Sequence, residues 1–178
     1  MTLARPRWGA TASNGSGDPF RHRGTERPYD GAVASDLQRF IDAQRDAYDA
    51  ALRELRAGRK TGHWIWFIFP QLAGLGRSQT SRYYGITSLD EARAYLDHPV
   101  LGPRIRECVD AVLGTSGTTP EAIFGSLDAM KVRSSMTLFH RAAADEARFT
   151  AVLEQFYRSV PDERTDSLIS DAAPTAQA

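Results

Sequence analysis

The sequence has few of the residues that build covalent or metal-centred sites. It contains a single cysteine, Cys108, which excludes an internal disulfide and a zinc site with several thiolates from one chain. The four histidines, at positions 22, 63, 98 and 140, include no pair at the i, i+4 spacing of helical metal ligands. We therefore expect no metal and no cofactor. The scarcity of cysteine fits a reducing compartment, and we expect a cytoplasmic protein.

Long apolar runs and an excess of either charge are also absent. No window reaches the ~18 consecutive apolar residues of a transmembrane helix, so we expect no membrane partner. Lys plus Arg and Asp plus Glu both number 22, which removes the overall attraction to phosphates on which nonspecific nucleic-acid binders depend. Nucleic acid is therefore disfavoured as a partner. No G-x-S-x-G motif supports serine-hydrolase chemistry, and no segment repeats.

The length and the composition of the chain indicate one soluble domain. The length of 178 residues, with 42% hydrophobic and 25% charged residues, suits a single core. Residues 1–30 are rich in Gly, Pro, Arg and Ser and define no apolar face, so we expect a disordered N-terminal extension. We place the folded domain at residues 31–170 and a second disordered segment at 171–178.

Apolar residues recur at spacings of three and four through most of this domain, which predicts an all-α, single-domain orthogonal array of about six to seven helices. The clearest helix begins after an N-cap at Ser35 and runs over residues 36–57. Others are expected over residues 88–97, 99–113, 126–143 and 145–157, with single turns near 119–125 and 165–169. His98 precedes a proline and is expected to form a helix junction, whereas Cys108 is expected in the core.

The segment from Gly62 to Gly85, GHWIWFIFPQLAGLGRSQTSRYYG, joins an apolar run to a hydroxyl-rich stretch. The run over residues 64–69 suits a buried strand or a buried helix equally well. Because nothing else in the chain alternates with period two, a strand here would have no partner. We therefore predict a short helix that ends at Pro70.

This segment also carries most of the candidate binding residues. The glycine loop resembles a phosphate-binding turn, in which backbone N–H groups and an arginine face an anion, although it matches neither the dinucleotide nor the P-loop motif. A histidine beside a tryptophan is more often a packed structural residue. The candidates here are His63, Trp64, Trp66, Gln71, Gly74, Gly76, Arg77 and Ser78.

A second group lies in the predicted helix over residues 126–143. Lys131, Ser134 and Ser135 fall within one turn, so the lysine and either hydroxyl can face one cleft. The serines can equally bond back to helix carbonyls or allow close helix packing. If the protein is an enzyme, His63 and Asp128 are the candidates for general acid or base.

Three blocks, HWIWFIFPQLAGLG, SLDEARAYLDHPVLGPRIRE and IFGSLDAMKVRSSMTLF, occur in this order between residues 36 and 168. In this respect the sequence resembles a bacterial family of unknown function whose members are often labelled "calpastatin". The resemblance implies an all-α, single-domain protein and no established activity. Calpastatin-type inhibitors are disordered repeats, whereas this chain is compact and unrepeated, so the label does not fit.

A fainter likeness, in the expected all-helical layout with tryptophans beside a polar cleft, is to the N-glycosidase and ADP-ribose-related superfamily. It implies a ligand of the nucleotide, ADP-ribose or ribosyl-phosphate type, and for an enzyme a hydrolase of N-glycosidase type. The first hypothesis is therefore that the protein binds, and as an enzyme hydrolyses, a phosphate-bearing small molecule in an aromatic and polar cleft. The alternative is a noncatalytic protein–protein interaction module that uses the tryptophan-rich segment as its contact surface.

Overall fold

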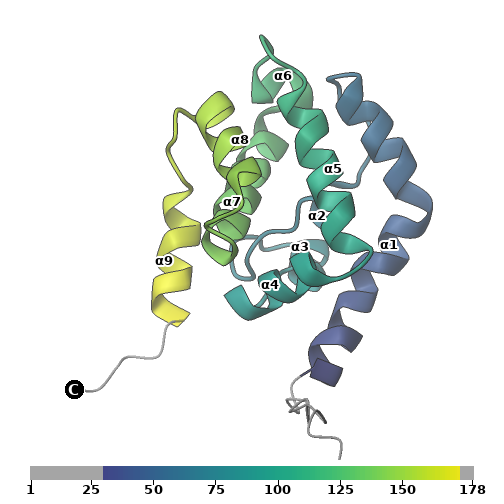
Figure 1. Cartoon of the computed structure of the whole chain (residues 1–178), viewed down its shortest axis with the longest axis vertical. Coiled ribbons are helices and arrows are strands. Elements are labelled where there is room, and N and C mark those ends of the chain that lie inside the picture. The colour runs from purple at the N-terminus through teal and green to yellow at the C-terminus, as the bar shows by residue number, and fades with distance from the viewer. Residues whose placement is uncertain (1–29, 173–178) are drawn as a thin grey trace, which may run out of the picture.

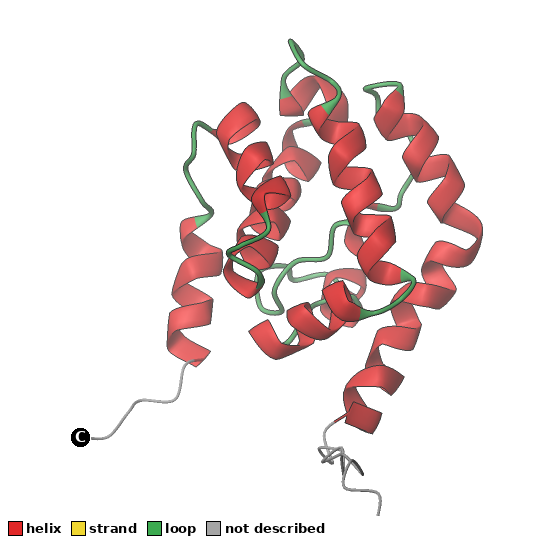
Figure 2. Cartoon of the chain, viewed as in Figure 1, coloured by secondary structure: helices red, strands yellow, loops and turns green. Residues whose placement is uncertain are grey.

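The computed structural model describes residues 30–172, with side chains from Leu37 onward. These residues form nine α-helices and no β-strand, which confirms the all-α class and corrects the expected number of six to seven helices (Figures 1 and 2). The helices are Asp30–Arg56 (α1), Ile65–Ile68 (α2), Gln79–Tyr83 (α3), Leu89–Asp97 (α4), Leu101–Leu113 (α5), Pro120–Phe124 (α6), Ser126–Ala142 (α7), Ala147–Tyr157 (α8) and Glu163–Ala172 (α9).

Helix α7 forms the centre of the packing. It contacts α2, α4, α6, α8 and α9, while α1 packs on α5 and α2 along the other side (Figure 1). Nine of its 17 residues are buried, among them Met136, Leu138 and Phe139, which are fully enclosed. Burial of these side chains removes their apolar surface from water and orders the helices around α7. Residues on α7 are thereby held in fixed positions relative to α2 and α6.

The helix boundaries differ from the expectation at three places. Helix α1 begins at Asp30, five residues ahead of the predicted N-cap at Ser35. Helix α3 has bounds that were not predicted, although the glycine loop suggested a helix start after it; Ser78 caps the helix, because its hydroxyl accepts from the Ser81 N–H at 3.1 Å. Helix α9 is ten residues long rather than a single turn and continues into residues 171 and 172. The predicted disorder of residues 1–29 and 173–178 lies outside the described residues.

Other local predictions are confirmed. The apolar run forms α2, a single helical turn in which the Ile68 and Phe69 N–H groups donate to the carbonyls of Trp64 and Ile65. His98 joins α4 to α5, since its Nδ1 accepts from the N–H groups of residues 100 and 101 at 3.1 and 3.3 Å. Cys108 is fully buried. This burial is the main reason why the pKa of its thiol is raised to about 12.

The chain between α2 and α4 is tied to the helices by buried polar groups. An isolated parallel bridge joins Leu72 to Ile86 and closes the loop that carries α3. The Gln44 amide of α1 donates to the Phe67 carbonyl at 2.7 Å. The Glu91 carboxylate, only 4% exposed, accepts from Arg39 at 2.7 Å. Because burial of an unsatisfied polar group is costly, these bonds fix the path of the segment.

No helix within residues 30–172 has the length and apolar character needed to cross a bilayer.

Candidate functional site

Two lysines converge on one carboxylate at the start of α7. Lys60 Nζ lies 2.6 Å from Asp128 Oδ2, and Lys131 Nζ lies 2.8 Å from Asp128 Oδ1. Lys131 comes from the next turn of the same helix, whereas Lys60 comes from the loop that leads into α2. The three side chains are 9% (Lys60), 17% (Asp128) and 26% (Lys131) exposed, so the group is shielded but reaches solvent at Lys131.

Each lysine also lies over the ring of a tryptophan. Lys131 Nζ is 4.5 Å from the centroid of a Trp66 ring, and Lys60 Nζ is 5.2 Å from the centroid of a Trp64 ring. Attraction between an ammonium and an indole face is worth ~0.5–2 kcal/mol, depending on solvent exposure. Trp64 is buried and packs near Phe69, whereas Trp66 is only partly buried. We call Lys60, Trp64, Trp66, Asp128 and Lys131 the lysine–tryptophan cluster.

Glu54 of α1 binds the loop that carries Lys60 and the indole of Trp64. Its Oε2 accepts three hydrogen bonds, from the Thr61 N–H at 2.6 Å, the Gly62 N–H at 2.9 Å and the Trp64 indole N–H at 2.9 Å. Burial opposes the charge of this carboxylate, but the three donors outweigh that effect and lower the pKa of Glu54 to about 2. The ionised carboxylate thus fixes both the loop after Lys60 and the orientation of the Trp64 indole.

The electrostatics of Asp128 restrict its chemistry. Burial acts to raise the pKa of Asp128, but hydrogen bonds from Lys131 and Lys60 dominate and hold the pKa below its ordinary value. A carboxylate that stays ionised and has both oxygens occupied is a poor general acid. It is better suited to hold the two ammoniums or to stabilise a positive charge that develops on a ligand.

The other predicted candidates are only partly brought together. His63 is exposed, and within the described residues it makes no hydrogen bond to Asp128, so the two candidate acid–base groups are not paired. Gln71 is partly buried, and its backbone carbonyl accepts from the Ile86 N–H at 2.9 Å.

The glycine loop has a clear structural role. A Cβ at Gly76 would lie 2.4 Å from the Ser81 Cβ, and one at Gly74, where φ is +94°, would meet Leu168 of α9. Ser78 caps α3, and Arg77 is exposed. Helix α3 has only five residues, so its N-terminus is not by itself an anion site. These contacts account for both glycines without a ligand.

The two serines of α7 behave differently from each other. The Ser134 hydroxyl donates to the Met130 carbonyl at 3.2 Å, which is the back-bonding considered from the sequence. Ser135 is fully buried, and its hydroxyl has no hydrogen-bond partner among the described residues. Ser135 follows Lys131 by four residues and Asp128 by seven, so the three share one face of the helix.

The more prominent hollows of the described region lie away from the cluster. One, of about 600 Å³, is lined by the α2–α4 loop, the start of α4 and α9, with Leu72, Leu89 and Leu168 among its apolar residues. Another, of about 510 Å³, lies between α4, α5 and the end of α7. A third, of about 240 Å³, is lined by residues of α7, α8 and the turn before α9. None of the three is lined by a residue of the lysine–tryptophan cluster.

Sequence reasoning missed Lys60 and Glu54, which both hold the cluster together. A signal for Lys60 was available, because the chain from Arg59 to Leu89 contains four Lys or Arg residues and not one Asp or Glu. A long acid-free stretch with several aromatic residues indicates a surface that receives negative charge. Glu54 carries no such signal, since it is one of many charged residues on an amphipathic helix.

Comparison with known proteins places the chain in a family. The family described as "Protein of unknown function (DUF1810)" matches residues 34–169. The chain belongs to this family. The resemblance expected from the sequence, to a family of unknown function, is thus confirmed at that level.

One solved structure supports both the family and the fold. It is the crystal structure of the conserved hypothetical protein Rv1873 from Mycobacterium tuberculosis, which is 50% identical, with a TM-score of 0.75 over 76% of this chain and 96% of the other. No curated protein matches the chain. Neither the description of the family nor the name of this structure states an activity.

Proposed function

We propose that the protein binds a phosphate-bearing small molecule with a planar group, of the nucleotide, ADP-ribose or ribosyl-phosphate type, at the lysine–tryptophan cluster. The observation that carries the proposal is the convergence of two ammoniums on one carboxylate, each ammonium over an indole ring. Lys60, Lys131 and Asp128 carry one net positive charge, which the ionised Glu54 bonded to Trp64 offsets, so the attraction for a phosphate comes from Lys131, the most exposed of the three groups.

The chemistry of the cluster suits such a ligand. Lys131 is the more exposed ammonium and has donors to offer a phosphate oxygen without leaving Asp128. The partly buried Trp66 offers a ring for stacking on a base or on a nicotinamide-like group. The acid-free stretch from Arg59 to Leu89 adds exposed cations, including Arg77, from which a second phosphate would gain attraction.

An N-glycosidase reaction is the enzymatic form of this proposal. Cleavage of a bond between ribose and a nitrogen base leaves positive charge on the sugar, and the ionised Asp128 would stabilise that charge. His63, exposed at the entrance to α2, would exchange a proton with the leaving base or the attacking water. The orphan hydroxyl of Ser135 would serve to position a sugar hydroxyl if the ligand opens the helix interface.

Thermal unfolding with a ligand panel tests the proposal. A ligand that binds only the native state stabilises it by about 2.7 kcal/mol at 100 times its Kd, so the melting temperature rises by several degrees. We expect this for ADP-ribose or a related nucleotide. We expect the shift to disappear in Lys131→Met and Trp66→Leu but to persist in the control Arg148→Met, which removes a cation paired with Asp110. No response to any phosphate-bearing ligand, or equal responses in all variants, would refute the proposal.

The alternative is the noncatalytic interaction module, and one observation favours it. Leu127 and Met130, on the first turns of α7, are 72% and 59% exposed beside Lys131. Large exposed apolar side chains at adjacent helix positions are typical of contact surfaces. A photoreactive amino acid at Met130 would then cross-link one protein in cells, whereas the same group at Arg148 would not. An indistinguishable cross-linking pattern at the two positions would exclude this alternative.

A further inference from the structure

The outer side of α2 carries two aromatic side chains that the core does not enclose. Ile65 and Ile68 lie three positions apart, so they share one face of this helical turn, and both are buried. Trp66 and Phe67, which lie between them in the sequence, are only partly buried and pack against the edge of the core. Trp66 belongs to the lysine–tryptophan cluster, whereas the Phe67 ring has no part in the site proposed above. The aromatic surface of α2 therefore extends beyond that site.

Two tyrosines continue this surface onto α3. The centroid of the Phe67 ring lies 5.4 Å from that of Tyr84, which in turn lies 4.9 Å from that of Tyr83. Tyr84 is partly buried, and Tyr83 is 59% exposed. These ring contacts join α2 to α3, and the two helices lie close together in Figure 1. We call Trp66, Phe67, Tyr84 and Tyr83 the aromatic row.

The α3 end of the aromatic row carries positive charge. Arg77 and Arg82 are exposed, and within the part of the chain that the structure describes neither side chain forms an ion pair or a hydrogen bond. Burial is the main cause of a raised pKa at Tyr84, and a carboxylate that adds to it is Asp42 of α1. Asp42 is paired with Arg45 at 2.6 Å. A phosphate at α3 would therefore be attracted by two available cations and opposed by a carboxylate that already has a partner.

Helix α3 is held in place although none of its residues is buried. The Ser81 hydroxyl donates to the Ser78 carbonyl at 2.8 Å, in addition to the cap that Ser78 provides. The bridge between Leu72 and Ile86 fixes the two ends of the loop that carries the helix. A side chain on a fixed backbone loses less conformational freedom on binding than one on a mobile loop. Tyr83 is therefore exposed and preorganised, as a ring that receives a ligand should be.

The aromatic row is longer than one base. A base that stacks on Trp66 leaves Tyr83, at the other end of the row, free for a second planar group. Stacking of one base on an aromatic side chain strengthens binding by about 5- to 150-fold. A long nucleic acid is disfavoured, because its binding depends on many phosphate contacts and the chain has as many acidic as basic residues. The row thus favours a ligand with two bases over one with a single base or a long strand.

We propose that the ligand of the lysine–tryptophan cluster is a dinucleotide, in which phosphate joins two nucleosides. One base stacks on Trp66 beside Lys131, and the other stacks on Tyr83. The phosphates between them are attracted by Lys131 at one end of the row and by Arg82 at the other. This inference rests on the proposed function and names the class of its ligand. Tyr83 becomes the residue that distinguishes a ligand with two bases from a ligand with one.

Calorimetric titration of the full chain with ADP-ribose and diadenosine diphosphate tests this inference. Both compounds contain adenosine and a pyrophosphate bridge, and they differ only in the second adenine, which is a hydroxyl in ADP-ribose. We expect diadenosine diphosphate to bind about 10-fold more tightly. If ADP-ribose binds and diadenosine diphosphate binds no more tightly, this inference is wrong while the proposed function stands. If neither compound binds, both proposals are wrong.

Variants of Tyr83 identify the ring that receives the second base. Tyr83→Leu should bring the two Kd values within about 2-fold of each other and leave the Kd of ADP-ribose unchanged, because only the second adenine stacks there. Tyr83→Phe keeps the ring and should preserve the preference for diadenosine diphosphate. The side chain is largely exposed, so both variants should fold. Lys131→Met should weaken both ligands, since both have phosphate at that end of the row. A preference that survives in Tyr83→Leu, or is lost in Tyr83→Phe, would overturn the assignment.

Discussion

Asp128 is the single side chain that holds the two ends of the lysine–tryptophan cluster together. Lys60 reaches it from the loop before α2 and Lys131 from within α7, so the carboxylate links segments that are far apart in the sequence. The sequence placed the tryptophans among the candidates as rings for stacking, Lys131 as a polar residue in a helix expected to be buried, and Asp128 as a possible general acid or base. It could not pair Lys60 with Asp128, since 68 positions separate them and only tertiary packing brings them within 2.6 Å.

Replacement of Asp128 by asparagine should therefore destabilise the protein more than the loss of an ordinary surface charge does. The change leaves two shielded ammoniums without their counter-ion, and removal of one partner from a shielded ion pair is costly. Because the group is not fully buried, we expect a loss of about 2 kcal/mol in the free energy of unfolding, measured with urea. Lys60 and Trp64 should also become more mobile.

The matched control is Asp90→Asn. Asp90 also lies in the first turn of a helix and also pairs with a basic residue three positions on, at 2.7 Å from Arg93, but this pair is exposed. Such pairs contribute only ~0–1 kcal/mol. If Asp128→Asn and Asp90→Asn lose the same free energy of unfolding, the shielded position of Asp128 does not strengthen its ion pairs.

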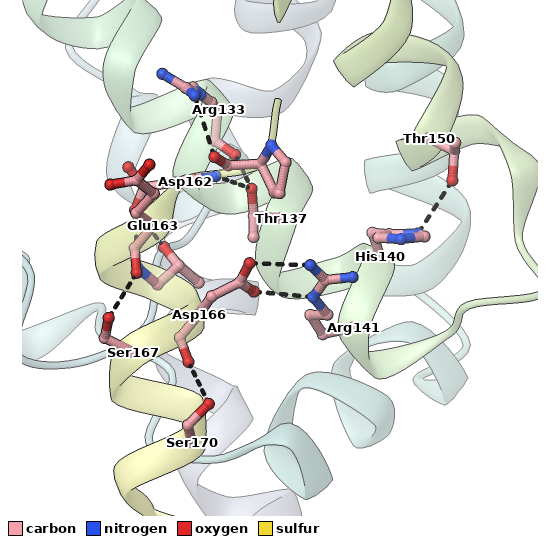
Figure 3. Close-up of polar contacts among 12 residues, drawn as sticks. Arg133, Thr137, His140, Arg141, Thr150, Asp162, Glu163, Asp166, Ser167 and Ser170 are labelled. Carbon is pink, nitrogen blue, oxygen red and sulfur yellow. Dashed lines mark hydrogen bonds and ion pairs between the residues drawn. The ribbon is translucent and has the colours of Figure 1, made fainter. Parts of the chain in front are cut away.

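At the scale of elements, the helices with clear apolar periodicity were predictable and the connections between them were not. The long helices α1, α5 and α7 follow from spacings of three and four. Helix α3 has no buried residue, so it has no apolar stripe to reveal it. Polar contacts help to fix α9 to α7: Arg141 of α7 forms a bidentate contact with Asp166 of α9 at 2.8 and 2.9 Å (Figure 3), and Arg133 donates to the Val160 and Pro161 carbonyls in the turn before α9. Contacts of this kind leave no periodic pattern in the sequence.

The corner between α4 and α5 gives a prediction at this scale. A Cβ at Gly102 would lie 2.0 Å from the Leu96 carbonyl oxygen, a backbone atom that also accepts from Arg106 at 3.1 Å. Gly102→Ala must therefore push the two helices apart. We expect a loss of about 3 kcal/mol or more in the free energy of unfolding, at the upper end of the range for overpacked sites.

Gly114→Ala is the control for this prediction. Gly114 ends α5 with a φ of −66°, and its nearest atom to an added Cβ would be the Ala111 carbonyl oxygen at 3.4 Å. An alanine is tolerated there, so the free energy of unfolding should change by less than about 1 kcal/mol in either direction. Urea unfolding of both variants provides the measurement. A Gly102→Ala protein as stable as Gly114→Ala would mean that the helix corner relaxes freely.

For the whole molecule, the balanced composition of 22 basic and 22 acidic residues hides an uneven distribution. The acid-free stretch from Arg59 to Leu89 depends on carboxylates from other elements, namely Glu54 of α1, Glu91 of α4 and Asp128 of α7. The loop is therefore held by carboxylates, and two of them, Glu54 and Asp128, have a pKa below the ordinary value because they are ionised while bonded to it. Composition alone predicts no such dependence, because it counts charges without saying which of them are neighbours.

Acid unfolding should accordingly depend on Glu54. Its pKa is about 2 in the folded protein against an ordinary value of 4.5, so the unfolded chain binds the proton first as the pH falls. The stability that Glu54 contributes is complete above pH 4.5 and is lost progressively toward pH 2. One proton taken up on unfolding changes the free energy by at most about 1.4 kcal/mol per pH unit, and solvent screening of this partly exposed group narrows the pH range over which that slope applies.

Urea unfolding between pH 4.5 and pH 2 measures this contribution. Glu54→Gln keeps the shape of the side chain but cannot titrate, so its free energy of unfolding should be lower than that of the original chain at neutral pH and should fall less steeply with acid. The control Glu163→Gln removes an exposed carboxylate from the first turn of α9 and should preserve the steep dependence. If the original chain and Glu54→Gln lose stability in parallel, the three hydrogen bonds to Glu54 do not hold the loop, and the acid sensitivity arises from general charge repulsion instead.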